Sequence, residues 1–161
     1  MTCADSSRSL QEISNLSLSA ILLAVGKAES KTLSVYKSKP FARFARKSLI
    51  SDADLWNAAH LANQGVIDAD LGGGVIKQRI ARAGEGKSGG SRSIILFRKY
   101  DRAVFVHGFE KRDKANIKAD ELIAFRRYAE IYLGFSNSEM AQQVEDGAIF
   151  KVKRPEGGDN A

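Results

Sequence analysis

Residues 75–109 read VIKQRIARAGEGKSGGSRSIILFRKYDRAVFVHGF, and this stretch decides the fold. It holds three segments rich in β-branched and aromatic residues, at 75–80, 92–98 and 103–109, separated by turns that contain glycine or aspartate. This pattern is typical of strands. Because the connections are short, neighbouring strands must pair antiparallel. The sequence therefore predicts an antiparallel sheet at the centre of the protein.

Helical patterns lie on both sides of this sheet. Residues 40–49 begin with a proline and place Phe41 and Phe44 on one face, as expected of an amphipathic helix. Ser51 is a good N-cap for the next helix, and Asp54 three residues later resembles the acidic partner of a capping box. Both helices are expected to form an apolar lid on the sheet.

A strand at 33–37 precedes the two helices, and a further helix at 120–133 follows the sheet. The order predicts an α+β fold: a small antiparallel sheet of about four strands with two N-terminal helices and a C-terminal helix. We expect this domain to span residues 33–134. Residues 1–32 are interpreted as an extension, flexible or derived from an upstream start codon. Residues 135–161 are expected to hold a short helix, a strand and a polar tail.

Composition narrows the class of protein. The 161 residues are 43% hydrophobic, enough for an ordinary core, and no apolar run approaches the roughly 18 residues that a membrane helix needs. The single cysteine, Cys3, can form no internal disulfide and leaves no thiolate cluster for a metal. A reducing cytoplasm is the simplest setting.

The positive charge is concentrated in one segment. Residues 72–118 hold 12 lysines and arginines against 4 acidic residues, a net charge of +8, whereas the rest of the chain carries 13 against 15. Such a segment could simply form a solvent-exposed basic face. Positive charge concentrated in one patch more often binds an anionic partner, and nucleic acid is the commonest such partner.

The stretch ARAGEGKS, residues 81–88, ends like a phosphate-binding loop. That loop requires a helix directly after it, whose N-terminus helps to hold the phosphates. Here the β-rich segment IILF follows, so we interpret the stretch as a hairpin loop. The acidic pair Asp68 and Asp70 lacks a third metal ligand and is interpreted as a turn before a strand. His60 is expected on a helix surface or partly buried.

Cationic and aromatic side chains gather on the predicted sheet. Lys77 and Arg79 are two residues apart and project from one face, and the same alternation places Phe105, His107 and Phe109 on one face of the third strand. Cations attract phosphates and rings stack on unpaired bases, so this surface is suited to single-stranded RNA. Its remaining members are Arg92 and Arg98 at the ends of the second strand, Arg82 and Lys87 in the loop before it, and Lys111 and Arg112 after the third strand.

Four short motifs make the chain resemble toxins of the RelE/ParE superfamily, closest to the RelE/HigB-like, phage-derived branch. They are Ile-Asp-x-Asp-Leu-Gly-Gly-Gly at 67–74, Lys-Gln-Arg at 77–79, Gly-Gly-x-Arg at 89–92 and Gly-Phe-x-Lys at 108–111. With FARFARKSLISDADL at 41–55, the resemblance covers about residues 33–134.

The resemblance implies a type II toxin: a ribosome-dependent mRNA endonuclease of the cytoplasm, held inactive by a cognate antitoxin encoded by a neighbouring gene. Such antitoxins commonly bind DNA. The cleavage uses no metal and no other cofactor, because the RNA 2′-hydroxyl attacks the neighbouring phosphate. Cationic side chains then stabilise the developing charge.

Roles follow residue by residue from the same resemblance. Arg79 and Arg92 would contact the scissile phosphate, and Lys77 or Lys111 would donate a proton or stabilise charge. His107 is either a general base or a packed strand residue. The RNA-contacting set would be Arg82, Lys87, Arg98, Phe109 and Arg112. Two other functions remain open: a ParE-like inhibitor of DNA gyrase and a non-catalytic RNA-binding module.

Overall fold

A computed structural model describes residues 33–81, 90–110 and 117–155. Within them the order is β1 (Ser34–Ser38), α2 (Lys39–Lys47), α3 (Asp52–Asn63), β2 (Ala69–Gly72), β3 (Val75–Ile80), β4 (Ser91–Arg98) and β5 (Arg102–Glu110). There follow α4 (Ala119–Gly134), α5 (Asn137–Glu145) and β6 (Ile149–Lys151). The expected α+β class is confirmed. So are the three central strands and the two lid helices, each to within a residue or two of the predicted ends.

The expected small antiparallel sheet of about four strands is wrong in two respects. The sheet has six strands, in the order β2-β3-β4-β5-β1-β6, and it is mixed. Strand β1 runs parallel to β5, with Val35 opposite Ala103, while β6 pairs antiparallel with β1. The parallel pairing joins segments about seventy residues apart, so no local turn signal could reveal it. Strand β2 was expected to be only a turn.

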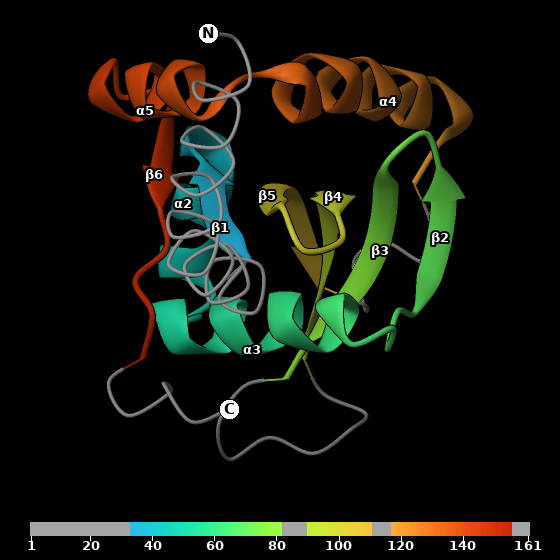
Figure 1. Cartoon of the computed structure of the whole chain (residues 1–161). Helices are drawn as coiled ribbons and strands as arrows, with labels where there is room; N and C mark the ends of the chain where they lie inside the picture. The colour runs from blue at the N-terminus through green and yellow to red at the C-terminus, as the bar shows by residue number, and fades with distance from the viewer. Residues whose placement is uncertain (1–32, 82–89, 111–116, 156–161) are drawn as a thin grey trace, which may run out of the picture. The chain divides into compact units, whose positions relative to one another are not determined.

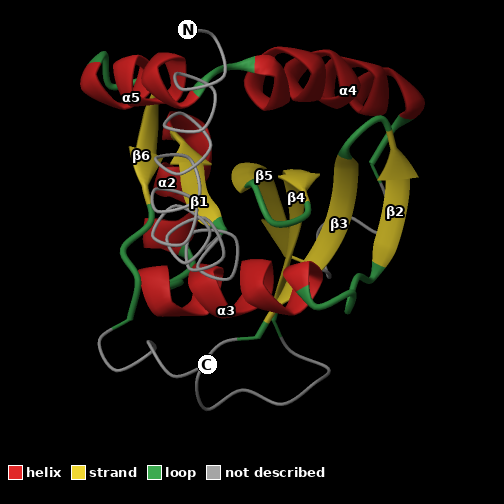
Figure 2. Ribbon diagram, in the orientation of Figure 1, coloured by secondary structure: helices red, strands yellow, loops and turns green. Residues whose placement is uncertain are grey.

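Helices cover both faces of the sheet. Figure 1 shows α4 and α5 along one side of it and α3 along the other, and Figure 2 shows the same layers by secondary structure. One hydrophobic cluster joins α2 and α3 to the sheet through Phe41, Leu55 and Phe105, so Phe41 is a core residue. A second joins α4 and α5 to the opposite face through Ala129 and Met140. The sheet is therefore buried on both faces over much of its width.

Local signals explain where the lid helices begin. The hydroxyl of Ser51 accepts the backbone N–H of Asp54 at 3.1 Å, and the Asp54 carboxylate accepts the N–H of Ser51 at 3.0 Å. This confirms the predicted capping box, which satisfies two N–H groups that the first turn leaves without helical partners. Ser38 caps α2 in the same way by accepting the N–H of Phe41.

The turn between β2 and β3 brings α4 close to the sheet. Gly74 has a φ of +82°, and a Cβ there would fall 2.7 Å from Leu133 Cδ1 of α4. Arg126 of α4 donates to the carbonyl of Leu71 on β2. The Gly-Gly-Gly motif thus permits both the turn and the close approach of α4.

Candidate functional site

The strand register places five of the predicted site residues on one face of the sheet. Across β3, β4 and β5, Arg79 lies opposite Arg92, and Arg92 lies opposite Phe109. One step along, Lys77 lies opposite Ile94, and Ile94 opposite His107. Directly opposed residues of antiparallel strands share a face, as do alternate residues of one strand. We call this surface the β3–β5 face.

Three cations form its open part. The side chains of Lys77, Arg79 and Arg92 are each partly exposed at the end of the sheet where β3 finishes and β4 begins. Residues directly opposed on antiparallel strands have Cβ atoms about 5 Å apart, and like charges in that position are destabilising. The two positive charges of Arg79 and Arg92 therefore repel each other, and an anion bound between the two side chains would reduce that repulsion.

The Arg92 side chain also has a hydrogen-bond donor without a partner in the described part of the chain. Its Nη1 atom is buried and has no hydrogen-bond partner among the residues that the structure describes. A buried donor without a partner costs about 1–3 kcal/mol. A phosphate oxygen would satisfy it with a charge-assisted hydrogen bond.

His107 lies on the same face under helix α4. Its ring centroid is 5.5 Å from that of Phe125 and 5.9 Å from that of Phe109. A register shift in β5 next to this position, between the pairs of Ile94 and Ile95, marks a β-bulge. Bulges re-aim neighbouring side chains and are common beside active sites. Helix α4 thus packs over this part of the face.

Phe109 requires a correction. It was expected to stack on RNA, but its side chain is only 6% exposed and belongs to the core beneath α4 and α5. Alternation along β5 correctly placed His107 and Phe109 on one face, but it was wrong for Phe105, which the bulge turns to the opposite face with α2 and α3. Nor could it show that a helix distant in the sequence covers the face of His107 and Phe109. A base could reach this ring only if the core opened.

The structure does not bring Arg98 to the cluster. It ends β4 six residues after Arg92, about 20 Å away at the rise of a strand. Its guanidinium pairs with Asp101 across a tight turn, with Nη1 3.1 Å from Oδ2. The remaining predicted residues, Arg82, Lys87, Lys111 and Arg112, lie outside the described residues. They follow Ile80 and Glu110, the ends of β3 and β5 nearest to the Arg79–Arg92 pair.

Sequence reasoning missed two neighbours of this face. Phe125 was not among the predicted site residues, and its contact with His107 depends on tertiary packing. Asp68 was interpreted as a turn residue, and its carboxylate does accept a backbone N–H, that of Arg79, at 2.6 Å. This places a carboxylate beside β3 at the level of the arginine pair. Only the pairing of β2 with β3 reveals that position.

The carboxylates of Asp68 and Asp70 both accept hydrogen bonds from backbone N–H groups. Asp70 Oδ1 accepts the N–H of Gly72 at 2.9 Å, as in an Asx turn. Within residues 33–81, 90–110 and 117–155, no three His, Cys, Asp or Glu side chains lie close enough together to hold a metal ion. Over the same residues, no helix is both long and apolar enough to cross a membrane.

One comparison with known proteins is informative. A family model described as the RelE toxin of the RelE / RelB toxin-antitoxin system matches residues 33–152. No curated protein sequence matches the chain. The family match runs from just before β1 to just beyond β6, so it includes every strand of the sheet and the whole β3–β5 face.

Proposed function

The chain belongs to the RelE toxin family of toxin–antitoxin systems, and from this premise we propose that it is a ribosome-dependent mRNA endonuclease. The family is named for a toxin–antitoxin pair, so a cognate antitoxin that holds the toxin inactive is its expected partner. We further assign the protein to the RelE/HigB-like branch and its action to the cytoplasm, where its substrate is translated.

The observation that carries the proposal is the Arg79–Arg92 pair. Arg79 and Arg92 are directly opposed across β3 and β4, with Lys77 two residues along the same face. Such a set binds a phosphodiester and stabilises the additional negative charge of its transition state. A surface that only binds RNA needs cations near phosphates. It does not need two directly opposed arginines, one of which has a buried N–H donor without a partner among the described residues.

The reaction proceeds by internal transfer at phosphorus. The 2′-oxygen of one nucleotide forms a bond to the adjacent phosphorus as the bond from phosphorus to the 5′-oxygen of the next nucleotide breaks. The proton of the 2′-hydroxyl passes to a general base, and the leaving 5′-oxygen receives a proton from a general acid. Arg79 and Arg92 contact the non-bridging oxygens, where charge accumulates.

Lys77 and His107 are the described residues suited to the proton transfers. Lys77 shares the open part of the face with both arginines, and its ammonium carries a proton that it could donate to the leaving oxygen. His107 lies on the next strand but one, opposite Ile94, and its imidazole suits a base near neutral pH. Lys111, beyond the end of β5, is a second candidate for the acid.

Primer-extension mapping of translated messages in expressing cells tests this proposal. The wild-type protein should yield cuts positioned by codon, and Arg79→Ala and Arg92→Ala should abolish them. Arg98→Ala is the matched control, because it removes the same charge about 20 Å away on β4. Growth arrest with intact messages and a DNA-damage response would instead indicate gyrase inhibition. RNA binding without cuts would indicate a non-catalytic module.

A further inference from the structure

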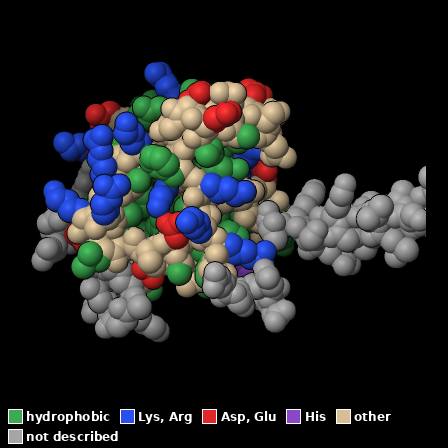
Figure 3. Space-filling model, turned by 90° about the vertical axis from the view of Figure 1, so that its left-hand side faces the viewer, with side chains coloured by type: hydrophobic (Ala, Val, Ile, Leu, Met, Phe, Trp, Pro, Cys, Tyr) green, Lys and Arg blue, Asp and Glu red, His purple; other side chains and the backbone are tan. Residues whose placement is uncertain are grey.

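A second cationic surface lies at the edge of the sheet formed by β1 and β6, away from the β3–β5 face. We call it the α2–β6 face. Figure 3 shows lysine and arginine side chains spread over this side of the molecule around exposed apolar groups. It is formed by Lys37 of β1, by Lys39, Arg43 and Arg46 of α2, and by Phe150, Lys151 and Lys153 of and beyond β6.

Helix α2 supplies an ordered row of charge. Lys39, Arg43 and Arg46 are spaced i, i+4, i+7 and are all exposed, so they form one stripe along the helix. The opposite side of α2 is buried through Phe41 and Ala45. Residues 39–47 contain no acidic side chain. The stripe therefore projects a continuous positive field into solvent.

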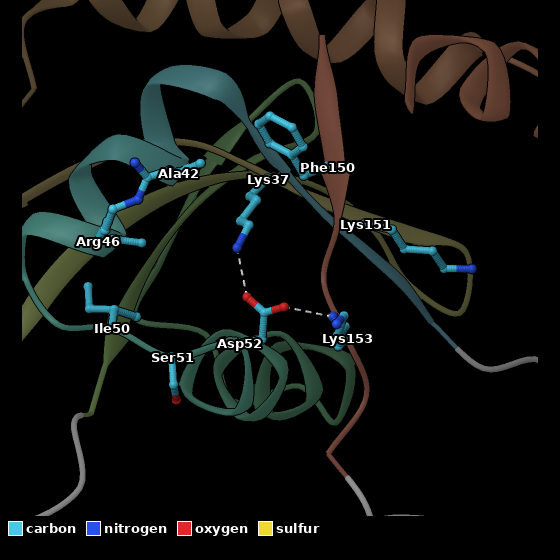
Figure 4. A pocket seen from close by; sticks show the side chains of 10 residues that line it. Lys37, Ala42, Arg46, Ile50, Ser51, Asp52, Phe150, Lys151 and Lys153 are labelled. Carbon is cyan, nitrogen blue, oxygen red and sulfur yellow. Dashed lines mark hydrogen bonds and ion pairs between the residues drawn. The ribbon is translucent and has the colours of Figure 1, made fainter. Parts of the chain in front are cut away.

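Strand β6 continues this charge across the sheet edge. A cavity of about 490 Å³ lies between α2, β1, the start of α3 and β6. Its floor is apolar, formed by Ala42, Ala45 and Ile50, and its rim carries Lys37, Arg46 and Lys153 (Figure 4). The Lys151 ammonium points away from the cavity along the outer edge of the sheet (Figure 4). The cations are thus spread along a surface and do not converge on one point.

The single acidic side chain lining this cavity is neutralised internally. Asp52 Oδ1 lies 2.7 Å from the Lys37 ammonium, and Oδ2 accepts the backbone N–H of Lys153 at 3.0 Å (Figure 4). Burial alone would raise the pKa of the Asp52 carboxyl. The hydrogen bonds from Lys37 and Lys153 and the two positive charges outweigh it and lower that pKa. Arg46, which also lines the cavity, makes no ion pair among the residues that the structure describes.

We propose that the α2–β6 face is a second RNA-binding surface, which holds an RNA backbone independently of cleavage. Cations spread over a helix stripe and an adjoining strand match a ligand with repeated negative charge. Phe150, 39% exposed at the centre of the face, offers a ring on which an unpaired base stacks. The inference goes beyond the proposed function, because binding here requires no reaction.

The favoured occupant is RNA and not an acidic peptide. A peptide docked in the cavity would need its carboxylates to converge on a few cations, whereas Arg46 and Lys151 point in different directions (Figure 4). A phosphate backbone can follow divergent cations. A face of this kind would anchor the protein on structured or single-stranded RNA of its target while the β3–β5 face engages the scissile bond.

Binding of the full chain to a fluorescent 2′-O-methyl oligouridylate tests the inference. This probe cannot be cleaved through its 2′-oxygen, so binding is measured apart from catalysis. Arg43→Glu combined with Arg46→Glu should weaken affinity at least about tenfold. The same change should reduce the slope of log affinity against log salt by about 1.4, the loss of two contacts to a single strand. Lys99→Glu with Arg127→Glu is the matched control, since it changes the net charge equally on other surfaces.

A second variant keeps the inference testable if the charge-reversed protein does not fold. Phe150→Ser removes the exposed ring without changing charge and should weaken binding about fivefold or more, the loss of one stacked base. Equal losses in the α2 variant and its charge-matched control would overturn the inference, because only net charge would then matter. So would poly-glutamate binding as tightly as the RNA probe. Cleavage lost in Arg92→Ala with probe binding retained would separate the two faces.

Discussion

Gly108 of β5 lies directly against the ring of Phe44 of α2. A Cβ built at Gly108 would fall 2.1 Å from Phe44 Cδ1, far inside van der Waals contact. Gly108 lies between His107 and Phe109 in the sequence and on the opposite face of β5. Helix α2, which carries cations of the α2–β6 face, packs against it there. The glycine of the Gly-Phe-x-Lys motif is therefore a packing requirement. It fixes α2 behind the β3–β5 face.

We predict that Gly108→Ala lowers the free energy of unfolding by about 1–3 kcal/mol, because overpacking forces Phe44 or α2 to shift. Urea denaturation monitored by circular dichroism measures the change. Gly134→Ala at the end of α4 is the control, since a Cβ there meets no atom within 4 Å. A Gly108 variant as stable as the wild type would show that the Phe44 ring moves without cost.

Lys77 offers a test of the acid in cleavage. Lys77→Arg keeps the charge but supplies a group that cannot give up a proton near neutral pH. If Lys77 is the acid, Lys77→Arg should lower the single-turnover cleavage rate on programmed ribosomes about 10²–10⁴-fold, as Lys77→Met should. Full activity in Lys77→Arg would instead assign it to charge stabilisation. Lys99→Met, in the β4–β5 turn, should leave the rate unchanged.

Gln78 holds the junction of α3, β2 and β3. Its amide is 3% exposed, donates to the carbonyls of Ala58 at 3.2 Å and Val66 at 2.8 Å, and accepts the N–H of Asp68. Gln78→Ala should reduce the free energy of unfolding by about 1–3 kcal/mol, since three backbone groups lose their partner and the carbonyl of Ala58 among them is buried. Gln64→Ala, on the exposed end of α3, should cost less than about 0.5 kcal/mol in the same urea titration.

Arg102 ties the start of β5 to the connection between α4 and α5. It is 5% exposed, and its Nη1 donates to the carbonyl of Tyr132 at 3.0 Å while Nη2 lies 3.4 Å from Asn137 Oδ1. Arg102→Leu should lower the free energy of unfolding by about 1.5–3 kcal/mol and speed hydrogen exchange in α5. Arg98→Leu removes an exposed ion pair in the adjacent turn and should cost at most about 1 kcal/mol. Equal costs would refute the tethering role of Arg102.

Asp52 makes stability depend on acid pH. Its pKa is lowered in the folded protein, so its contribution to stability is fully present above the unfolded pKa. The contribution is lost as the pH falls through the lower folded pKa. The difference in unfolding free energy between wild type and Asp52→Asn should therefore be largest near pH 7 and shrink towards pH 3. Glu130→Gln, exposed on α4, makes the same change in net charge and is the control. A difference that grew on acidification would contradict the ion pair with Lys37.

The sequence predicted the parts of this protein that depend on near neighbours. Alternation and turn chemistry located β3, β4 and β5, and the spacing of Ser51 and Asp54 located the start of α3. The same alternation placed Lys77 and Arg79 on one face, because side chains of a strand point to opposite sides in turn. Antiparallel connection then brought Arg92 to that face.

Predictions failed where a residue's surroundings come from distant segments. The parallel pairing of β1 with β5 enlarged and mixed the sheet, and the packing of α4 buried Phe109. Counting charge along the chain assigned −2 to everything outside residues 72–118. In the folded protein, residues 37–46 and 151–153 from that remainder meet at the β1–β6 edge and form a second cationic surface.

The amino-acid sequence alone thus determined the central strands, the helix caps and the RelE-type motifs, since each depends on residues a few positions apart. Tertiary structure alone decided the strand order, the covering of His107 and Phe109, and the grouping of Lys37, Arg46 and Lys153. The physical reason is that burial and charge density are properties of space. Strands β1 and β6 lie far apart in the sequence and become neighbours only in the folded sheet.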